Sequence, residues 1–260
     1  MSLHHKLYTI QMVNQLLLLF GIGYTIYTGQ WWLLLMSFII VEIQALFQVV
    51  VYHRMIAHNS FKTYEWLRRV LIFITIWNTQ SPTIIWAGIH RWHHANSEKE
   101  NDPHSPYINR DDPEKKRISF WQALKVWFAF FDYETVPFRT MRDLFRDKYQ
   151  VWIMKNYFKI LLTPVILLAL YDPILAIFVY SAPAALGLHL GAIGTVVLHM
   201  HGYQNFDTKD NSKNSWFGSL LLWGDGWHNN HHRFPREYTT KVKPWEFDPA
   251  GWFIKMIKID

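Results

Sequence analysis

The sequence predicts an all-α membrane protein: four transmembrane helices in two hairpins, with a cytosolic helical cap that holds a histidine-rich di-metal site. Two observations lead to this prediction. Apolar stretches long enough to cross a bilayer occur in two pairs, and histidines at metal-ligand spacing follow each pair closely. We divide the single predicted domain, 1–260, into a hairpin over about 8–51, a cap with histidine motifs over about 52–156, a hairpin over about 157–200 and a second cap segment over 201–260.

The composition fits a membrane protein that binds metal through nitrogen or oxygen. Half of the 260 residues are hydrophobic, and the chain contains 14 Trp, 13 Tyr and 18 Phe. It has no Cys, so disulfides and thiolate ligands are excluded, and any metal has to be bound by imidazole, carboxylate, amide or water. The net charge of +6 indicates an anionic membrane face or an acidic partner, with no nucleic acid.

The first predicted hairpin begins with the apolar stretch Tyr8–Thr28, which contains no charged residue. A second apolar stretch, Trp31–Val51, follows after a short turn, and the tryptophans at its start are typical of an interfacial aromatic belt. Glu42 lies inside this stretch, where a carboxylate facing lipid would be costly. We therefore expect it to face protein or a cavity, either pairing with Gln44 or Gln48 or lining a substrate path.

The first histidine pair, His53 and His58, follows the second predicted span directly. Residues five apart lie about 140° apart on a straight α-helix, so both imidazoles reach one site only if the helix bends or ends there. Tyr64–Ile89 is apolar but interrupted by polar residues and a proline, which favours helices at the membrane interface over a clean span. One further interfacial helix is predicted at Phe120–Phe131, within the polar stretch Asn96–Tyr149.

The second predicted hairpin comprises Tyr157–Tyr171 and Pro173–Met200. Neither hairpin turn carries a positive charge, because no Lys or Arg lies between residues 6 and 54 or between residues 159 and 209. By the positive-inside rule, all histidine motifs and both termini then face the cytoplasm. The basic residues of the cap are expected to form a solvated face or contact lipid headgroups, with docking of an acidic redox partner as the alternative. They are Lys115, Lys116, Arg117, Arg139, Arg142, Arg146 and Lys148.

The motif HxxHH occurs twice and is the strongest sign of a metal site. On an α-helix, residues i, i+3 and i+4 share one face, so the three imidazoles of each motif are predicted to point into the same small volume. Neutral imidazoles that converge in this way suit a borderline metal ion. The two motifs are His90, His93 and His94, and His228, His231 and His232.

Four further residues extend or border the predicted site. His199 lies at the cytoplasmic end of the fourth predicted span, at the membrane depth of the other motifs, and is a candidate ninth ligand. Asp102 follows the second motif closely and is a plausible acceptor for the N–H of a ligating imidazole. His104 is either an ordinary loop residue or part of the site. His189 lies deeper and is expected to pack or hydrogen-bond within the bundle.

The number of imidazoles indicates two metals, because one zinc ion uses about four protein ligands at most. A two-metal site that activates O2 and attacks an unactivated C–H bond requires redox-active iron. A buried apolar chain as substrate would explain why the site lies beneath a membrane bundle. A zinc hydrolase and a metal carrier are the alternatives from other classes. The first finds no HExxH motif here, and the second requires ligands along a pathway, whereas these lie at one end.

Three segments, HRMIAH, HRWHHANSEKENDPHSP and GDGWHNNHHRFP, resemble the three histidine boxes of the membrane fatty acid desaturases. The resemblance is greatest to the Δ9 group, which includes acyl-CoA and bacterial and cyanobacterial acyl-lipid enzymes. It implies four transmembrane helices, a cytosolic cap, two Fe2+ ions and O2-dependent insertion of a cis double bond into a saturated acyl chain. A related di-iron fatty acyl hydroxylase, which shares the fold and the metals, is the alternative function.

The same resemblance implies nine metal ligands and no acid–base catalyst beyond them. The segment HMHGYQNFD resembles the family's HxxGxRxYD, which adds the histidine between the second and third boxes. Thr195 stands one turn before that histidine, where the family has an Asn that binds a metal through water, and a hydroxyl can hold the same water. The implied ligands are His53, His58, His90, His93, His94, His199, His228, His231 and His232.

The resemblance also implies the substrate and the partners. The family's acyl tunnel ends between the first two spans, so Val41 and Ala45 are candidates for setting the accepted chain length. The acyl group arrives on a lipid or on CoA, and O2 is the second substrate. No fused cytochrome segment is visible in the sequence, so electrons are expected from a separate ferredoxin or b5-type cytochrome.

Overall fold

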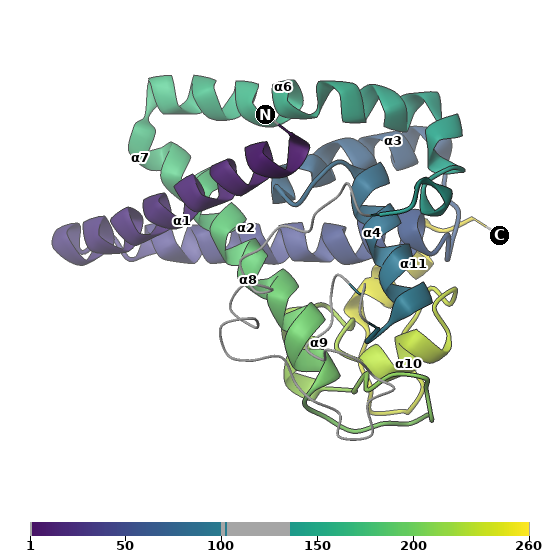
Figure 1. Ribbon diagram of the computed structural model, residues 1–260. Helices are drawn as coiled ribbons and strands as arrows, with labels where there is room; N and C mark the ends of the chain where they lie inside the picture. Colours follow the sequence, from purple (N-terminus) through teal and green to yellow (C-terminus); the bar gives the residue numbers. More distant parts are fainter. Residues whose placement is uncertain (1, 100–101, 103–135, 260) are drawn as a thin grey trace.

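The computed structural model describes residues 2–99, 102 and 136–259, and for Thr195 the backbone alone. Within these residues the chain is helical, with isolated β-bridges but no extended strand (Figure 1). The elements are α1 (Leu3–Thr28), α2 (Trp32–Phe47), η1 (Gln48–Ala57), α3 (Glu65–Ile74), η2 (Thr75–Asn78), α4 (Thr83–Asn96), η4 (Phe138–Thr140), η5 (Leu144–Arg146), α6 (Lys148–Tyr171), α7 (Pro173–Ala176), η6 (Ile177–Ser181), α8 (Ala182–Val196), η7 (Val197–His199), α9 (Trp216–Leu221), α10 (His228–Arg233) and α11 (Pro249–Ile257). Of these, η1 and η6 are π-helical and the other η segments are 3-10 helices.

Four continuous helical stretches in the described part are long and apolar enough to cross a membrane, as the sequence predicts. They cover Leu3–Thr28, Trp32–Ala57, Lys148–Tyr171 and Pro173–His199. The first and third begin well before the predicted apolar stretches, because polar residues add turns to their amino ends. The pairing of the four as hairpins and the side of the membrane on which the histidines lie remain predictions.

The ends of these helices coincide with residues that stop or start a helix. The Ser2 hydroxyl accepts a hydrogen bond from the His5 N–H and caps α1. Gly29 ends the same helix in the left-handed conformation (φ +70°), and its N–H donates to the Thr25 carbonyl at 2.8 Å. Asp172 caps α7 by accepting from the Leu175 N–H at 2.9 Å. Short turns therefore join consecutive long helices.

Helix α1 buries a narrow stripe whose members alternate at spacings of four and three residues. The stripe is Leu7, Gln11, Asn14, Leu18, Gly21 and Thr25. It faces α8 and η6, and a Cβ added at Gly21 would lie 3.2 Å from the Phe178 ring. The Ser37 hydroxyl of α2 donates to the Phe178 carbonyl at 2.7 Å. Small and polar residues at close helix contacts are typical of membrane bundles.

The segment predicted to lie at the interface is not one straight span. Helices α3 and α4 meet at 80°. Thr79, with φ +60°, and Pro82 occupy the break between them, and proline favours an extended residue before it. The bend directs α4, which carries the second histidine motif, away from the axis of α3 (Figure 1).

The polar residues inside the spans have mixed environments. His189 bonds within the bundle as predicted, with Nε2 3.2 Å from Oε1 of Gln15. Gln44 and Gln48 instead donate to the Trp77 carbonyl and to Gln80, at 3.2 and 3.1 Å. Neither therefore makes the pairing with Glu42 that the sequence suggested. Oε1 of Glu42 is buried with no hydrogen-bond partner among the described residues.

The predictions for the polar segment after α4 can be compared with the structure only in part, because some of its residues lie outside the described part. Arg139, Arg142, Arg146 and Lys148 are all exposed, as a solvated face requires. His104, the basic residues at 115–117 and the helix predicted at 120–131 lie outside the described residues.

The buried core joins η1, α3, α4, α6 and α11. This packing fixes the histidine-bearing segments relative to the long helices.

Candidate metal centre

The first histidine pair lies on a π-helix, which resolves the difficulty of its five-residue spacing. A π-helix forms hydrogen bonds from residue i+5 to residue i, and the His58 N–H donates such a bond to the His53 carbonyl at 3.1 Å. Residues joined in this way lie nearly one above the other, so the two ring centroids are 4.9 Å apart. The helix also ends at Ala57. The sequence predicted that the helix would bend or end here. In the structure it ends after Ala57, and its last turns are wider than those of an α-helix.

The third motif occupies all of the short helix α10, and two glycines place it. A Cβ added at Gly226 would lie 1.9 Å from the backbone nitrogen of Ser219. Gly224 has φ +105°, which disfavours any side chain, and a Cβ there would meet Asp248 at 2.3 Å. The GDG segment can therefore pack directly against α9 and the α11 cap. Asp225, between the two glycines, reaches the site.

Nine imidazoles converge in two groups, within each of which the potential ligand atoms lie within 4.8 Å of one another. The five-imidazole group is His53, His58, His90, His94 and His231, and the four-imidazole group is His93, His199, His228 and His232. These are the nine histidines that the sequence singled out. One part of the prediction was wrong: the three histidines of each HxxHH motif do not share one volume. Each motif contributes to both groups.

Helix geometry explains the division. At about 100° per residue, positions i and i+4 lie about 40° apart, whereas i+3 lies about 60° to the other side of i. In α4, His90 and His94 therefore enter the five-imidazole group and His93 enters the other. In α10 the assignment is reversed, because His231 alone joins the five-imidazole group. Each motif gives two histidines to one group and one histidine to the other, so both helices take part in both groups.

The distances between ring nitrogens fit the edges of a metal coordination shell. With metal–nitrogen bonds of about 2.0–2.1 Å, neighbouring ligands lie about 3.0 Å apart at right angles and about 3.4 Å apart at tetrahedral angles. The Nε2 atoms of His53 and His231, and those of His94 and His231, are 3.0 Å apart. In the other group, Nε2 of His228 lies 3.1 Å from that of His199, and the His93–His232 separation is 3.4 Å.

The environment favours the neutral form that binds metal for several of these imidazoles, whereas at His93 the effect of burial is outweighed by Asp102 and the pKa is raised. Burial and neighbouring imidazoles hold the pKa values of His58, His228 and His231 well below the usual range. Burial also lowers the pKa of His232 to about 4, although Asp210 opposes the shift. Neutral nitrogens directed at one another at about 3 Å need a cation or a shared proton between them, so the donor set fits a bound metal.

Four carboxylates face the opposite ring nitrogen, Nδ1, of four of these histidines. Because a carboxylate only accepts, Nδ1 carries the proton and Nε2 is left free for a metal. The contacts are His93 with Asp102 at 2.7 Å, His199 with Glu98 at 3.0 Å, His232 with Asp210 at 2.6 Å, and a short contact of His53 with Asp225. The structure thus places Asp102 where the sequence suggested, and adds three acids that sequence reasoning missed.

Asp225 also belongs to a buried ion network around Arg54. The guanidinium Nη2 donates to Asp225 at 2.7 Å, and Nη1 donates to Asp248 at 2.8 Å and to the Tyr238 carbonyl at 2.9 Å. The Arg54 side chain is only 1% exposed. Asp248 in turn caps α11 through the Gly251 N–H. The network therefore joins His53 to the carboxyl-terminal segment.

The remaining predicted site residues lie away from the imidazoles or cannot be placed. The backbone of Thr195 lies in α8, one turn before His199, but its side chain is outside the described part. Val41 and Ala45 are buried on α2, and a Cβ added at Gly187 of α8 would lie 3.7 Å from Val41.

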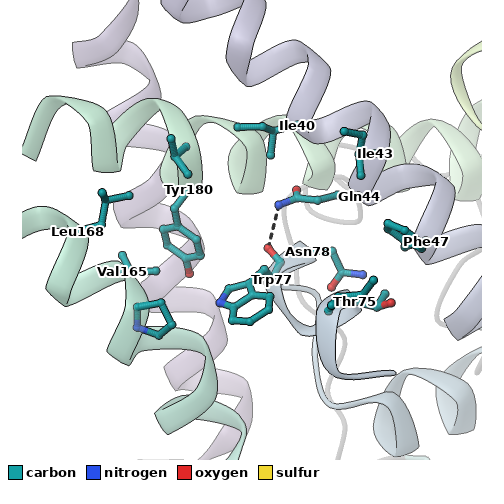
Figure 2. A pocket seen from close by; sticks show the side chains of 13 residues that line it. Ile40, Ile43, Gln44, Phe47, Thr75, Trp77, Asn78, Val165, Leu168 and Tyr180 are labelled. Atoms are coloured by element: carbon teal, nitrogen blue, oxygen red, sulfur yellow. Dashed lines mark hydrogen bonds between the residues drawn. The ribbon is translucent and has the colours of Figure 1, made fainter. Parts of the chain in front are cut away.

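A separate apolar cavity of about 390 Å³ lies beside α2, between η2, α6 and η6 (Figure 2). Ile40, Phe47, Val165 and Leu168 are among its lining residues. Gln44 crosses one side of it to bond the Trp77 carbonyl. Neither Val41 nor Ala45 lines this cavity.

Comparison with known proteins places this geometry in context. A family profile described as fatty acid desaturase matches residues 29–251. The chain is 32% identical over 217 residues to sn-2 palmitoyl-lipid 9-desaturase of Nostoc sp. (strain 36), covering 80% of this chain and 71% of that protein. It is 28% identical to Delta-9 acyl-lipid desaturase 2 of Arabidopsis thaliana (88% and 73% covered). It is 27% identical to acyl-CoA 5-desaturase AL21 of Anemone leveillei (80% and 63% covered).

Proposed function

Because the chain belongs to the fatty acid desaturase family, we propose that it inserts a cis double bond at Δ9 of a saturated acyl chain, using O2 and two iron ions held by nine imidazoles. The family and the relatives establish an enzyme that desaturates fatty acids. The metal, its number and the bond position are the proposal. One observation carries it: the convergence of the Nε2 atoms in two groups with the spacing of coordination shells.

The donor set favours iron over other metals. Imidazole suits iron, zinc and copper, but removing hydrogen from an unactivated carbon requires a redox-active metal, which excludes zinc. When bound, the two irons supply the reduction of O2 and the oxidation of the acyl chain. Overall, the two hydrogens removed from the acyl chain, two electrons from a donor and two protons from solvent would convert O2 to two waters. The proposed ligands are His53, His58, His90, His93, His94, His199, His228, His231 and His232.

The protein's own residues hold and orient this centre. Carboxylates fix the tautomer of four imidazoles, so that each presents Nε2 to the metal position. Burial shields the imidazoles from bulk water and favours the neutral form of His228 and His231. We also propose that the Thr195 hydroxyl holds a metal-bound water. We propose no general acid or base among these residues, whose role would be to hold and orient the metals.

The substrate proposal rests on the relatives and on the membrane helices. The Nostoc and Arabidopsis proteins are named as Δ9 acyl-lipid enzymes, and the Anemone protein as an acyl-CoA Δ5 enzyme. We propose a Δ9 acyl-lipid substrate, with acyl-CoA as the alternative carrier, and propose that Val41 and Ala45 limit the chain length. Electrons come from a separate ferredoxin or b5-type cytochrome, and the histidines and both termini face the cytoplasm.

The test is gas chromatography–mass spectrometry of double-bond positions in total lipids of a desaturase-deficient host. The host expresses the chain, a His231→Ala variant, or a His201→Ala variant as control, since His201 is exposed and belongs to neither group. We expect a new cis-Δ9 monoene that disappears with His231→Ala and persists with His201→Ala. A hydroxy acid in its place would assign the chain to the hydroxylases. No new lipid from iron-loaded protein supplied with an electron donor would contradict the proposal.

A further inference from the structure

We infer that the two metal positions are unequal, and that Glu98, Asp102 and Asp210 are positioning residues that make the four-imidazole position the tighter site and the first to be oxidised. This inference rests on the proposed function, because it assumes that each group holds one iron. It concerns residues that contact the ligands and never the substrate. Its basis is the distribution of carboxylates around the two groups.

Glu98 and Asp102 form one unit after the end of α4. Oδ1 of Asp102 accepts from Nδ1 of His93 at 2.7 Å, and Oδ2 accepts from the Glu98 N–H at 2.6 Å. The Asp102 side chain is fully buried. Glu98 has φ +60°, a conformation that costs energy for any residue except glycine and is found mainly where a site demands it. The turn aims both carboxylates at the four-imidazole group.

The Glu98 carboxylate links the lone histidine to a distant loop. Oε1 accepts from Nδ1 of His199 at 3.0 Å and from the Asn211 N–H at 2.7 Å. Oε2 accepts from the side-chain amide of Asn211 at 2.6 Å. The side chains of His199 and Glu98 are both fully buried. Three donors therefore fix the direction of a buried carboxylate beside one ligand.

Asp210 supplies the third carboxylate from the loop that contains Asn211. Oδ2 accepts from Nδ1 of His232 at 2.6 Å. Oδ1 accepts from the Ser212 hydroxyl at 2.6 Å and from the Ser212 N–H at 3.1 Å. Three of the four imidazoles in this group therefore donate to a carboxylate, and each of the three carboxylates accepts further hydrogen bonds that fix its direction.

The five-imidazole group has a different charge environment. His53 donates to Asp225, but Arg54 donates to the same carboxylate at 2.7 Å and offsets its charge. In the described part of the chain, His58, His94 and His231 contact no carboxylate, so at most two of these five imidazoles do. A carboxylate on Nδ1 whose charge is not offset by a cation makes the imidazole a stronger electron donor to a metal. The four-imidazole position should therefore favour the ferric over the ferrous ion and bind either more tightly.

The experiment titrates the detergent-purified full chain with 57Fe up to saturation, and follows each loading by iron analysis and Mössbauer spectroscopy. The variants Glu98→Gln, Asp102→Asn and Asp210→Asn remove one charge each with little change of shape. Asp225→Asn does the same at the other group. Asp207→Asn is the matched control, because Asp207 is exposed in the loop that carries Asp210. His228→Ala and His58→Ala identify the spectral component that belongs to each group.

We expect two components in the unmodified protein. Glu98→Gln, Asp102→Asn and Asp210→Asn should weaken iron binding about tenfold to a hundredfold at the component that His228→Ala removes. On partial oxidation, that component should become ferric first, and Asp210→Asn should abolish this order. Loss of both components in equal proportion, or first oxidation of the component that His58→Ala removes, would overturn the inference. Unmodified protein without two irons would instead contradict the proposed function.

The measurement does not depend on every variant folding. The order of oxidation is read in the unmodified protein, and only the assignment of the components needs a histidine variant. Rescue offers a second check: Asp210→Glu restores the charge, so it should recover more iron at the affected component than Asp210→Asn does. Equal iron content in Asp210→Glu and Asp210→Asn would overturn the electrostatic role and leave a steric one.

Discussion

His93 and His94 are adjacent in the chain, yet their imidazoles belong to different groups: His93 to the four-imidazole group and His94 to the five-imidazole group. The 100° step of an α-helix separates them. His231 and His232 divide in the same way from the opposite side. One turn of α4 and one turn of α10 therefore contribute to both groups, so that a shift of either helix displaces imidazoles in both.

This division predicts that His93→Ala and His94→Ala abolish desaturation by at least a hundredfold but lose different irons. Each removes one ligand from one group only. Mössbauer spectra of the two variants should retain complementary components. His201→Ala, at an exposed histidine outside both groups, should retain both components and full activity. Loss of the same component in both variants would show that the groups do not hold separate metals.

Arg54 should be a large contributor to stability. Arg54→Met leaves Asp225 and Asp248 buried without their counter-charge, and breaking such a network from one side costs about 3–5 kcal/mol. We expect a marked fall in the thermal unfolding temperature in detergent. Arg69→Met is the control, because the Arg69–Glu65 pair is more than half exposed, and it should leave the unfolding temperature unchanged. Similar temperatures for both variants would contradict the prediction.

The metal-free protein should lose stability as the pH falls from about 6.5 to about 4. In this interval the unfolded chain protonates its histidines at their usual pKa of about 6.5. The folded chain resists, because the pKa of His232 is about 4 and those of His58, His228 and His231 are also lowered. Stability is thus fully present above pH 6.5 and falls by about 1.4 kcal/mol per pH unit for each such imidazole.

Thermal unfolding of metal-free protein across this pH range measures the effect. His232→Ala should reduce the slope by the share of one imidazole, whereas His201→Ala should not reduce it. A pH-independent unfolding temperature between 6.5 and 4 would show that these imidazoles protonate in the folded chain as readily as in the unfolded one.

Gly226→Ala should disrupt the third histidine motif without touching a ligand. The added Cβ would lie 1.9 Å from the Ser219 nitrogen and 2.3 Å from the Gly218 carbonyl carbon, both backbone atoms that cannot rotate away. Overpacking costs about 1–3 kcal/mol, and the shift should move His228 and lower iron content. Gly23→Ala is the control, since a Cβ there meets nothing within 4 Å. Full iron content in Gly226→Ala would contradict the structure of this turn.

Enlarging Ala45 should shorten the longest acyl chain that the enzyme accepts. Ala45 is buried on α2, so a Leu side chain has to occupy space within the bundle. The product chain lengths in the desaturase-deficient host measure the effect. Ile39→Leu, at an exposed position of the same helix that does not line the apolar cavity, should leave them unchanged. Unaltered product lengths in folded, active Ala45→Leu would remove Ala45 from the proposed tunnel.

The sequence was sufficient to predict the four long helices and to single out the nine histidines that converge in two groups, whose role as metal ligands stays a prediction. Apolar stretches of membrane length and the HxxHH spacing are local signals, and both need only a few neighbouring residues. Even His199 could be found, because it ends a predicted span. Local spacing did not reveal how the histidines divide between the groups. The third and fourth residues after the first histidine lie about 60° and 40° to either side of it, and only the position of a second helix decides which of them joins which group.

The supporting acids could not be predicted in the same way. His199 and Glu98 are 101 residues apart, and His53 and Asp225 are 172 apart. No periodicity connects such positions. Asp102 could be predicted because it lies nine residues after His93. A weaker signal existed for the other three, because Glu98, Asp210 and Asp225 lie four, eleven and three residues from the nearest histidine of the two groups.

The π-helical turn of η1 has a mechanical consequence for the helix that carries it. Up to Ala45, α2 buries every fourth residue, so one face of the helix packs against the bundle. From Val49 onward nearly every side chain is enclosed, and the wider coil resets the rotation before His53. The π-helical turn therefore sets the direction in which His53 leaves a helix whose earlier part is fixed by its packing in the bundle. Deleting one residue between 48 and 52 should tighten this turn and rotate His53 away from the other imidazoles of its group.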